Sequence, residues 1–435
     1  MKTQLFNTVD LIVFPLMLCI IWMLLRYFKK HQPPELQKYM FPGFLLRVVG
    51  TIFIAIIYQY IYGYGDTYAY YTNTQILREF FYHDFTAWVR IMFSDPTSSH
   101  PDVLKYIDRV QEVYKEASFV YQSTENANVS KVGSLFNIFC FDSYLGISLC
   151  FGTLSFLGCW YIFKTFTTIF PGFERQFAYL SLYIPSLWFW GSGILKDPIS
   201  LFGLGILFFN IFASKKNILR RSIFICLGAV ILFYIKSYIF FVFALSLFLV
   251  YFVVFFNSLK LAGKGVFLFI IFVFVIFNLE NISDWYNLGI EEAMTQSRKF
   301  FDVYAYMAQP GDSTIMMTFE NTTYGFFKLC LQGFITVFTR PYPWELRKIV
   351  YLFVILENLF LYYLLFKKIK YLPTVMHHNH SRVIGFAILF SLFMGIVVGA
   401  TAFNLGTITR YRLPALALLY AGVFAWKLKP AKKEI

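Results

Sequence analysis

PSLWFWGSGILKDPISLFGLGILFFNIF, residues 185–212, consists of two apolar runs separated only by the pair Lys196–Asp197. The first run belongs to an apolar stretch over residues 177–194, and the second covers residues 198–213. Each stretch crosses, or nearly crosses, a hydrocarbon core when it is helical. An ionisable pair between two such runs is costly and indicates a function. Pro198 suits the first turn of a new helix. We therefore expect one helix to leave the membrane here and another to re-enter it.

Apolar runs of this kind recur along the whole chain. It has 435 residues, of which 58% are hydrophobic and 14% charged, and its mean hydropathy is +0.60. A soluble domain cannot cover that much apolar surface, whereas lipid can. Aromatic residues make up 22% of the chain, which fits lipid-facing and interfacial positions. The composition therefore predicts an integral membrane protein.

The pattern predicts an all-α fold with about eleven transmembrane helices in a single polytopic membrane domain, residues 1–435. Their approximate ranges are 9–25, 43–62, 134–163, 177–194, 198–213, 222–236, 238–256, 265–279, 349–366, 383–403 and 412–427. Two large loops remain, 63–133 and 280–348. Both show helical periodicity with aromatic residues on one face, so we expect helices that lie on the membrane surface.

When these spans cross the membrane alternately, most lysine and arginine residues fall on the same side of it. They concentrate in the short segments 26–31, 214–221, 260–264, 367–370 and 427–433. Basic loops are retained on the cytoplasmic side, which predicts an outside N-terminus and an inside C-terminus. Retention of loops also explains the net charge of +14, so no nucleic-acid partner is expected. The two large loops are then extracytoplasmic.

One short apolar segment affects this orientation. Residues 325–339 contain Lys328 and Gln332 and end at a Pro-rich turn. Counting the segment as a crossing would place the basic segment 367–370 outside. We therefore interpret it as re-entrant or as lying on the surface.

No metal site or disulfide framework is indicated. The six cysteines form no CxxC, and most lie inside apolar runs. His377, His378 and His380 resemble a metal cluster, but they fall in a basic inside loop without nearby carboxylates. We interpret this loop as solvated.

The first polar candidate is GDTYAYY, residues 65–71, just after the second span. Asp66 can accept a proton from a sugar hydroxyl, and rings such as Tyr68 and Tyr70 can stack on a pyranose face. The alternative is an interfacial aromatic belt in which Asp66 begins a helix. The Lys196–Asp197 turn is the second candidate. Its backbone N–H groups and Lys196 could hold a phosphate oxygen.

Lys236 lies between two spans, near the expected outer boundary. It is a further candidate phosphate contact, with a snorkelling turn residue as the alternative.

Two more candidates lie on the predicted outer side. In RPYPWE, residues 340–345, two prolines hold Arg340 and Glu345 in a fixed relation, and Trp344 offers a stacking face. In RYRLP, residues 410–414, Arg410 and Arg412 oppose the usual charge bias. A fork that binds phosphate is one reason for them, and snorkelling to lipid headgroups is the alternative.

At these residues the chain resembles the multipass bacterial glycosyltransferases of the GT-C class, and the related membrane polymerases that build surface polysaccharide. The resemblance covers four short patches: GDTYAYY, PSLWFWGSGILKD, RPYPWE and RYRLP. It implies a bacterial cytoplasmic-membrane enzyme in polysaccharide or glycoconjugate assembly. Its donor is a sugar on a polyprenyl phosphate, and its acceptor is a glycan or lipid-linked saccharide.

The resemblance also implies roles for individual residues. Asp66 is the general base, and Lys196, Arg340, Arg410 and Arg412 neutralise the departing phosphate. The chain departs from the class pattern in two ways. An extra span precedes Asp66, and the residue after Asp66 is Thr67 where the class has a second acidic residue. Asp197 and Glu345 therefore stay open as alternative bases. No cofactor is indicated, and a divalent cation stays open.

Three other readings compete with a transferase of this kind. One is a repeat-unit polymerase that relies on arginines more than on a carboxylate base. A transporter or lipid flippase usually has internal repeats and charges deep inside its spans, and neither pattern is seen in the sequence. A non-catalytic membrane subunit of an envelope assembly is the third reading.

Overall fold

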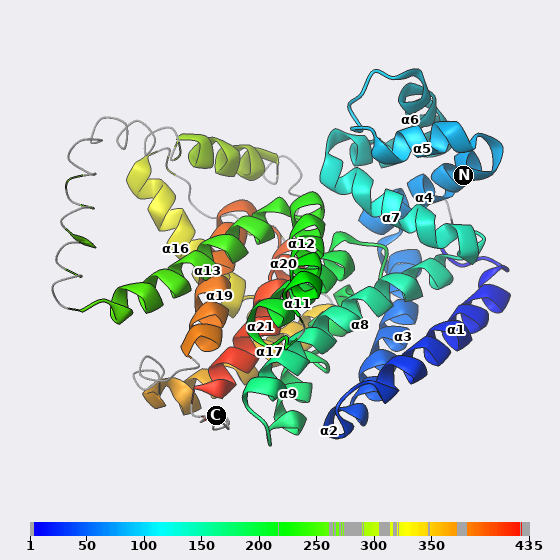
Figure 1. Ribbon diagram of the computed structural model, residues 1–435. Helices are drawn as coiled ribbons and strands as arrows, with labels where there is room; N and C mark the ends of the chain where they lie inside the picture. Colours follow the sequence, from blue (N-terminus) through cyan, green and yellow to red (C-terminus); the bar gives the residue numbers. More distant parts are fainter. Residues whose placement is uncertain are drawn as a thin grey trace. The chain divides into compact units, whose positions relative to one another are not determined.

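The computed structural model describes residues 4–215, 217–260, 264, 267–268, 271, 273, 289, 291–303, 314–315, 320, 322–346, 349–371, 381–426 and 428. Contacts divide the chain into two compact units, one built mainly from Met1–Phe240 and the other from Phe241–Leu428. Each unit is described by itself. The regular structure of the described residues is helical (Figure 1), which confirms the expected all-α class.

Among the described residues, seven helical segments are long and apolar enough to cross a membrane, as expected for a multipass membrane protein. They are α1 (Asp10–Lys30), Pro34–Tyr62 with α2 (Pro34–Gln37), α3 (Met40–Ile56) and η1 (Ile57–Tyr62), α8 (Tyr144–Ile169), α12 (Ile218–Ile235), α13 (Ser237–Ser258), Val350–Tyr371 with most of α17 (Ile349–Lys368) and η4 (Ile369–Tyr371), and Arg382–Thr401 within α19 (Ser381–Thr401). The total of eleven crossings stays a prediction. Most of the expected span 265–279, and His377, His378 and His380, lie outside the described residues.

The expected span 134–163 consists of two helices, α7 (Thr124–Cys140) and α8. Between them Phe141 and Asp142 have positive φ angles of 48° and 62°, which end the first helix. Arg78 donates to the Asp142 carboxylate at 2.6 Å, and Ser143 caps α8 by accepting from the N–H of Gly146. Asn137 also donates to the Asp142 carboxylate, so local polar residues as well as the distant Arg78 fix this corner within the apolar run.

The expected span 177–194 is also divided, into α9 (Glu174–Ser181) and α10 (Pro185–Trp190). Pro185 cannot continue a preceding helix. The carbonyl of Leu182 at the break accepts a hydrogen bond of 2.8 Å from the guanidinium of Arg47, a fully buried residue of α3. Arg47 therefore satisfies a backbone carbonyl that the break leaves without a helical partner. After the break, the chain continues through α10 to Lys196.

In the first unit, α8 is the central helix, and 78% of its most apolar stretch is buried inside the protein. It packs along α11 (Lys196–Phe212). At Gly158 and Gly205 the two backbones approach so closely that a Cβ on either residue would collide with the other helix. Small residues permit such an approach between helices. The position of Lys196 and Asp197, at the first turn of α11, is thus fixed by the central helix.

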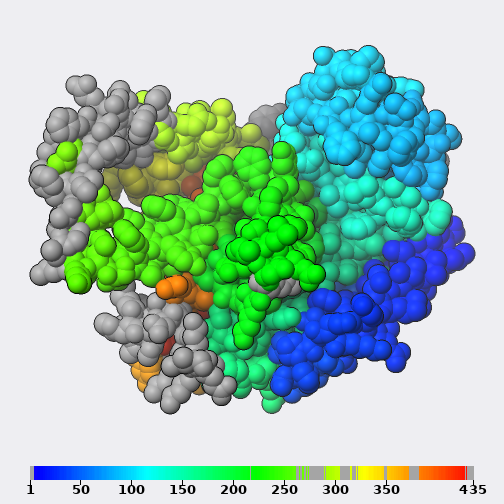
Figure 2. All heavy atoms as spheres, viewed as in Figure 1, coloured from blue at the N-terminus to red at the C-terminus, as the bar shows by residue number. Residues whose placement is uncertain are grey.

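The loop 63–133 is helical, as expected. It contains α4 (Asp66–His83), α5 (Phe85–Phe93), α6 (Pro101–Val113) and η2 (Lys115–Gln122), which lead into α7. In Figure 2 the cyan atoms of α4–α6 form one solid block. These helices pack on one another through buried polar contacts, including a 2.7 Å hydrogen bond from Tyr106 to Asn73. Their contact with a membrane surface stays a prediction.

The second unit places α19 against both α16 (Thr323–Thr339) and α21 (Leu413–Ala425), and α20 (Leu405–Tyr411) precedes α21. Gly333 and Gly399 bring α16 and α19 into backbone contact. Residues 325–339, expected to be re-entrant or surface-lying, thus form a helix packed along a candidate span. Whether this helix crosses the bilayer stays open to test.

Candidate functional site

Asp66 lies at the end of a candidate span, where the chain turns into α4. Gly63 and Gly65 have φ angles of 70° and 128°, a region that favours glycine. The turn directs Asp66 into a cleft of about 620 Å³, which it lines together with Tyr64, Tyr114, Glu116 and Phe119, among others. Glu116 is a second carboxylate of this cleft that sequence analysis missed.

The two tyrosines predicted to stack on sugars have different positions. Tyr68 lines the cleft, but only 5% of its surface is exposed, and its hydroxyl donates to the carbonyl of Tyr58. Tyr70 is buried and donates to Asn126 Oδ1 at 2.8 Å. Tyr64 is 73% exposed and is the ring best placed to meet a ligand. Tyr70 instead joins α4 to α7.

The structure brings three of the predicted charged residues, Lys196, Asp197 and Lys236, into one cluster. Lys196 Nζ lies 3.2 Å from Glu125 Oε2, at the start of α7. The other Glu125 oxygen accepts from the backbone N–H and the hydroxyl of Ser237, at 2.9 and 2.7 Å. One carboxylate thus joins α7, α11 and the turn between α12 and α13.

Glu125 was missed because its partner lies 71 residues away in sequence. The only local signal is Ser123, which caps the helix and predicts an acidic residue in the first turn. Burial by itself would raise the pKa of the Glu125 carboxyl, but the charge of Lys196 and the hydrogen bonds from Ser237 outweigh it. The pKa is therefore lowered from 4.5, and Glu125 is ionised at neutral pH.

Asp197 and Lys236 form a second ion pair at 2.6 Å, and both side chains are almost completely buried. A buried carboxylate and ammonium in contact compensate each other's charge. In this conformation Asp197 is therefore not an accessible base, and Lys236 is not an accessible phosphate ligand. Lys196, whose side chain keeps 14% of its surface exposed, is the accessible cation of the cluster.

The cluster is connected to the Asp66 cleft through Tyr70. Asn126, which accepts from Tyr70, follows Glu125 directly. The Tyr70 ring also contacts Phe119, a residue of the cleft wall, with centroids 6.1 Å apart. Lys196 does not belong to the lining of the cleft itself. The ion-pair cluster and the Asp66 cleft are therefore neighbouring but distinct sites.

In the second unit the turn at residues 340–345 is held as expected. Arg340 Nε lies 3.5 Å from Glu345 Oε1, and the other Glu345 oxygen accepts from the N–H of Tyr342 at 2.9 Å. Trp344 stacks on Tyr342 with centroids 4.9 Å apart and is 81% exposed. Trp344 is therefore available to a ligand or to lipid. Glu345 is tied to its own turn.

The two predicted arginine segments of this unit meet at Asn358. Its side-chain amide donates to the carbonyl of Arg340 at 3.1 Å, and its Oδ1 accepts from Arg412 at 2.9 Å. Arg412 has no exposed surface and also lies 3.8 Å from Glu357. A phosphate would have to displace these partners. Arg410 is 9% exposed and lies over the Tyr411 ring.

Within the described residues, no group of three or more His, Cys, Asp or Glu side chains is arranged to hold a metal ion. The clusters of the first and second units are separate observations, and their convergence on one pocket stays a prediction. No protein-family model matches the chain, and no curated protein or solved structure has significant similarity to it.

Proposed function

We propose that this protein is an integral-membrane glycosyltransferase that acts at the outer face of the bacterial cytoplasmic membrane. Its donor is a sugar linked to polyprenyl phosphate, and its product enters surface polysaccharide or glycoconjugate assembly. The proposed topology has eleven crossings, an outside N-terminus and an inside C-terminus. The observation that carries the proposal is the aromatic cleft at the end of a candidate span, into which Asp66 is directed.

The cleft has the composition that sugar transfer needs. Tyr64 and Phe119 provide apolar ring surfaces, while Asp66 and Glu116 provide carboxylates that accept hydrogen bonds from hydroxyl groups. A volume of about 620 Å³ is in the range of small-ligand sites. Its position beside a candidate span suits a donor whose lipid tail stays in the bilayer. These features favour a lipid-linked sugar over a soluble nucleotide sugar.

The proposed reaction moves one proton and exchanges one bond. Asp66 accepts the proton of the acceptor hydroxyl, and that oxygen forms a bond to the anomeric carbon of the donor. The bond between the anomeric carbon and the lipid phosphate oxygen breaks, and the phosphate departs as an anion. Lys196 is the proposed cation for this anion.

The test uses the full-length protein in lipid nanodiscs, with radiolabelled polyprenyl-phosphate sugars as donors. We expect sugar transfer with release of the lipid phosphate, and a loss of about 10²–10⁴-fold in Asp66→Asn because a general base is removed. Asp302→Asn is the matched control, since Asp302 is exposed and pairs across one helix turn with Arg298.

Two results would count against the proposal. Full activity in Asp66→Asn would remove the base assignment. Movement of the lipid across the bilayer without bond cleavage would instead identify a flippase.

A further inference from the structure

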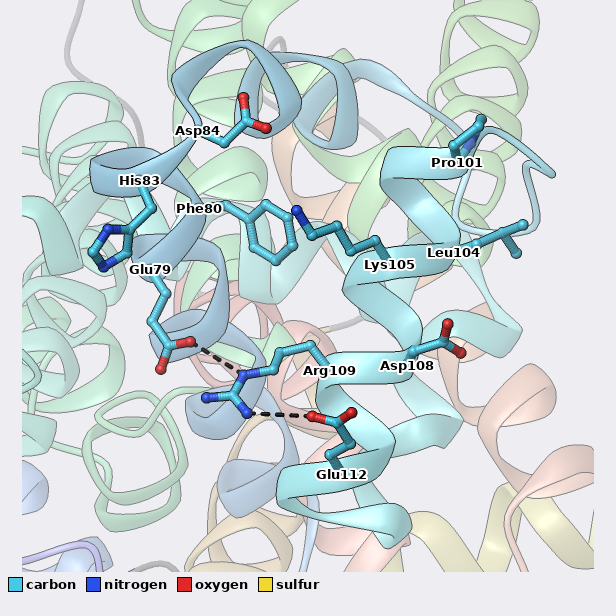
Figure 3. A pocket seen from close by; sticks show the side chains of 10 residues that line it. All are labelled: Glu79, Phe80, His83, Asp84, Pro101, Leu104, Lys105, Asp108, Arg109 and Glu112. Carbon is cyan, nitrogen blue, oxygen red and sulfur yellow. Dashed lines mark hydrogen bonds and ion pairs between the residues drawn. The ribbon is translucent and has the colours of Figure 1, made fainter.

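A second cavity lies along the seam between α4 and α6. Its volume is about 720 Å³. In Figure 3, Glu79 and Arg109 face each other across the seam, and the Lys105 side chain extends towards Phe80. Arg109 is held between two carboxylates, 3.4 Å from Glu79 and 3.3 Å from Glu112. The cavity is therefore a groove with paired charged side chains on its walls and the buried ring of Phe80 beneath Lys105.

The groove and the Asp66 cleft are two separate cavities, which adjoin at the C-terminal end of α6. Helix α4 begins with Asp66 in the cleft and ends with Glu79 and its neighbours in the groove. On the opposite wall, Glu112 lines the groove and the next residue, Val113, lines the cleft. From Ala69 to Glu79 the helix rises by about 15 Å. A ligand of several units could therefore extend from the cleft into the groove.

The lining selects a ligand class. It alternates carboxylates, which only accept hydrogen bonds, with Lys105 and Arg109, which only donate them. Sugar hydroxyl groups do both. The Phe80 ring is only 8% exposed, with the Lys105 ammonium 5.8 Å from its centroid, so the charged side chains carry the recognition. A polyanion would meet more negative than positive side chains here. No metal-binding group is found among the described residues, including those of this groove.

We infer that the α4–α6 groove binds the acceptor glycan, at sugar residues several positions away from the one that reacts at Asp66. The choice of ligand rests on the proposed function. Since the cleft alone accommodates a single sugar, a ligand that also occupies the groove is a chain of several sugars. Long acceptors consequently bind more tightly than short ones, and the gain comes from the groove.

The experiment measures binding and transfer separately, with the full-length chain in nanodiscs. The probes are oligosaccharides of one to six residues, released from the host's surface polysaccharide by partial hydrolysis and tagged with a fluorophore. Fluorescence anisotropy in the Asp66→Asn background gives Kd without turnover. We expect Kd to fall at least about tenfold from one residue to six, which corresponds to about 1.4 kcal/mol.

The double variant Lys105→Ala/Arg109→Ala is expected to lose that gain and to bind the single sugar as before. Arg298→Ala/Lys299→Ala removes two exposed charges elsewhere and is expected to keep the gain. The inference is overturned if no oligosaccharide binds, if Kd is independent of length, or if the groove variant behaves like its parent.

The two proposals fail in different ways. In one case, binding depends on acceptor length, the groove variant abolishes this dependence, and the wild-type protein turns over no donor. This result refutes the proposed function, while the groove remains a glycan-binding site. Turnover by the wild type, with an unchanged dependence of KM on acceptor length in the groove variant, refutes the groove alone.

Discussion

Two ion pairs of the first unit, which share neighbouring residues of α11, differ in their access to the surface. The side chains of Lys196 and Glu125 keep 14% and 30% of their surface exposed, whereas those of Lys236 and Asp197 keep 2% and 1%. The buried pair joins the start of α11 to the end of α12. The accessible pair lies beside it, where a ligand could replace Glu125 as the partner of Lys196.

The second unit contains the same combination with arginines. Arg340 and Glu345 keep 30% and 21% of their side-chain surface exposed, whereas Arg412 and Glu357 keep 0% and 6%. In both units, the charged residues that the sequence marks as functional candidates therefore divide into buried and accessible ones. The buried kind stabilises the helices, and the accessible kind is available for chemistry. Burial, which sequence does not give, separates them.

Removal of one member of a buried pair is expected to have the largest effect. Lys236→Met leaves Asp197 buried without its ammonium partner, and we expect a loss of about 3–5 kcal/mol of unfolding free energy. Thermal unfolding in detergent, followed by tryptophan fluorescence, measures it. Adding Asp197→Leu should recover much of the loss, because the two charges then disappear together. A single variant as stable as the wild type would contradict the structural role.

Removal of the accessible cation is expected to reduce activity while leaving stability nearly intact. For Lys196→Met we expect about a 10²-fold decrease in sugar transfer, as for the loss of one group that stabilises developing charge. The loss of unfolding free energy should be smaller than in Lys236→Met, because Glu125 keeps its hydrogen bonds from Ser237.

Lys328→Met is the control, because Lys328 also pairs with a glutamate, Glu320, on an exposed surface. Equal activities of the two variants would show that Lys196 is no more important than a surface lysine.

The smallest effect concerns the pH dependence of Glu125. Its pKa is lowered in the folded protein from 4.5, so its contribution to stability is present above the unfolded pKa. It is lost as the pH falls through the lower folded pKa. Below pH 4.5 the wild type should therefore lose its stability advantage over Glu125→Gln, an advantage of less than about 1 kcal/mol. A constant difference from pH 7 to pH 3 would contradict the pairing.

The transmembrane helices could largely be predicted because lipid-facing apolar runs are a local property. The span predicted at 238–256 is α13, Ser237–Ser258, and the span predicted at 222–236 is α12, Ile218–Ile235. The breaks before Tyr144 and Pro185 were missed. Pro185 and Asn137 are local signals for them, whereas Arg47 and Arg78, which also contact the breaks, come from distant helices.

The site was predicted in part for the same reason. Lys196, Asp197 and Lys236 are conspicuous between apolar runs, and the structure brings them together. Their separation into an accessible and a buried pair depends on Glu125, which only the tertiary fold brings near. For Arg412 a signal existed, since Glu357 is an acidic residue inside an apolar run and needs a cationic partner.

The most direct test concerns the side of the membrane on which the two accessible pairs lie. Tyr64 lines the Asp66 cleft, which is linked to the first pair through Tyr70, and Trp344 belongs to the turn of the second pair. Both are exposed, at 73% and 81%. Each can be replaced by cysteine in a variant whose six native cysteines are changed to serine. In intact spheroplasts, a maleimide that cannot cross the membrane should label both Tyr64→Cys and Trp344→Cys. Labelling of either position only after the membrane is permeabilised would contradict an active site on the outer face.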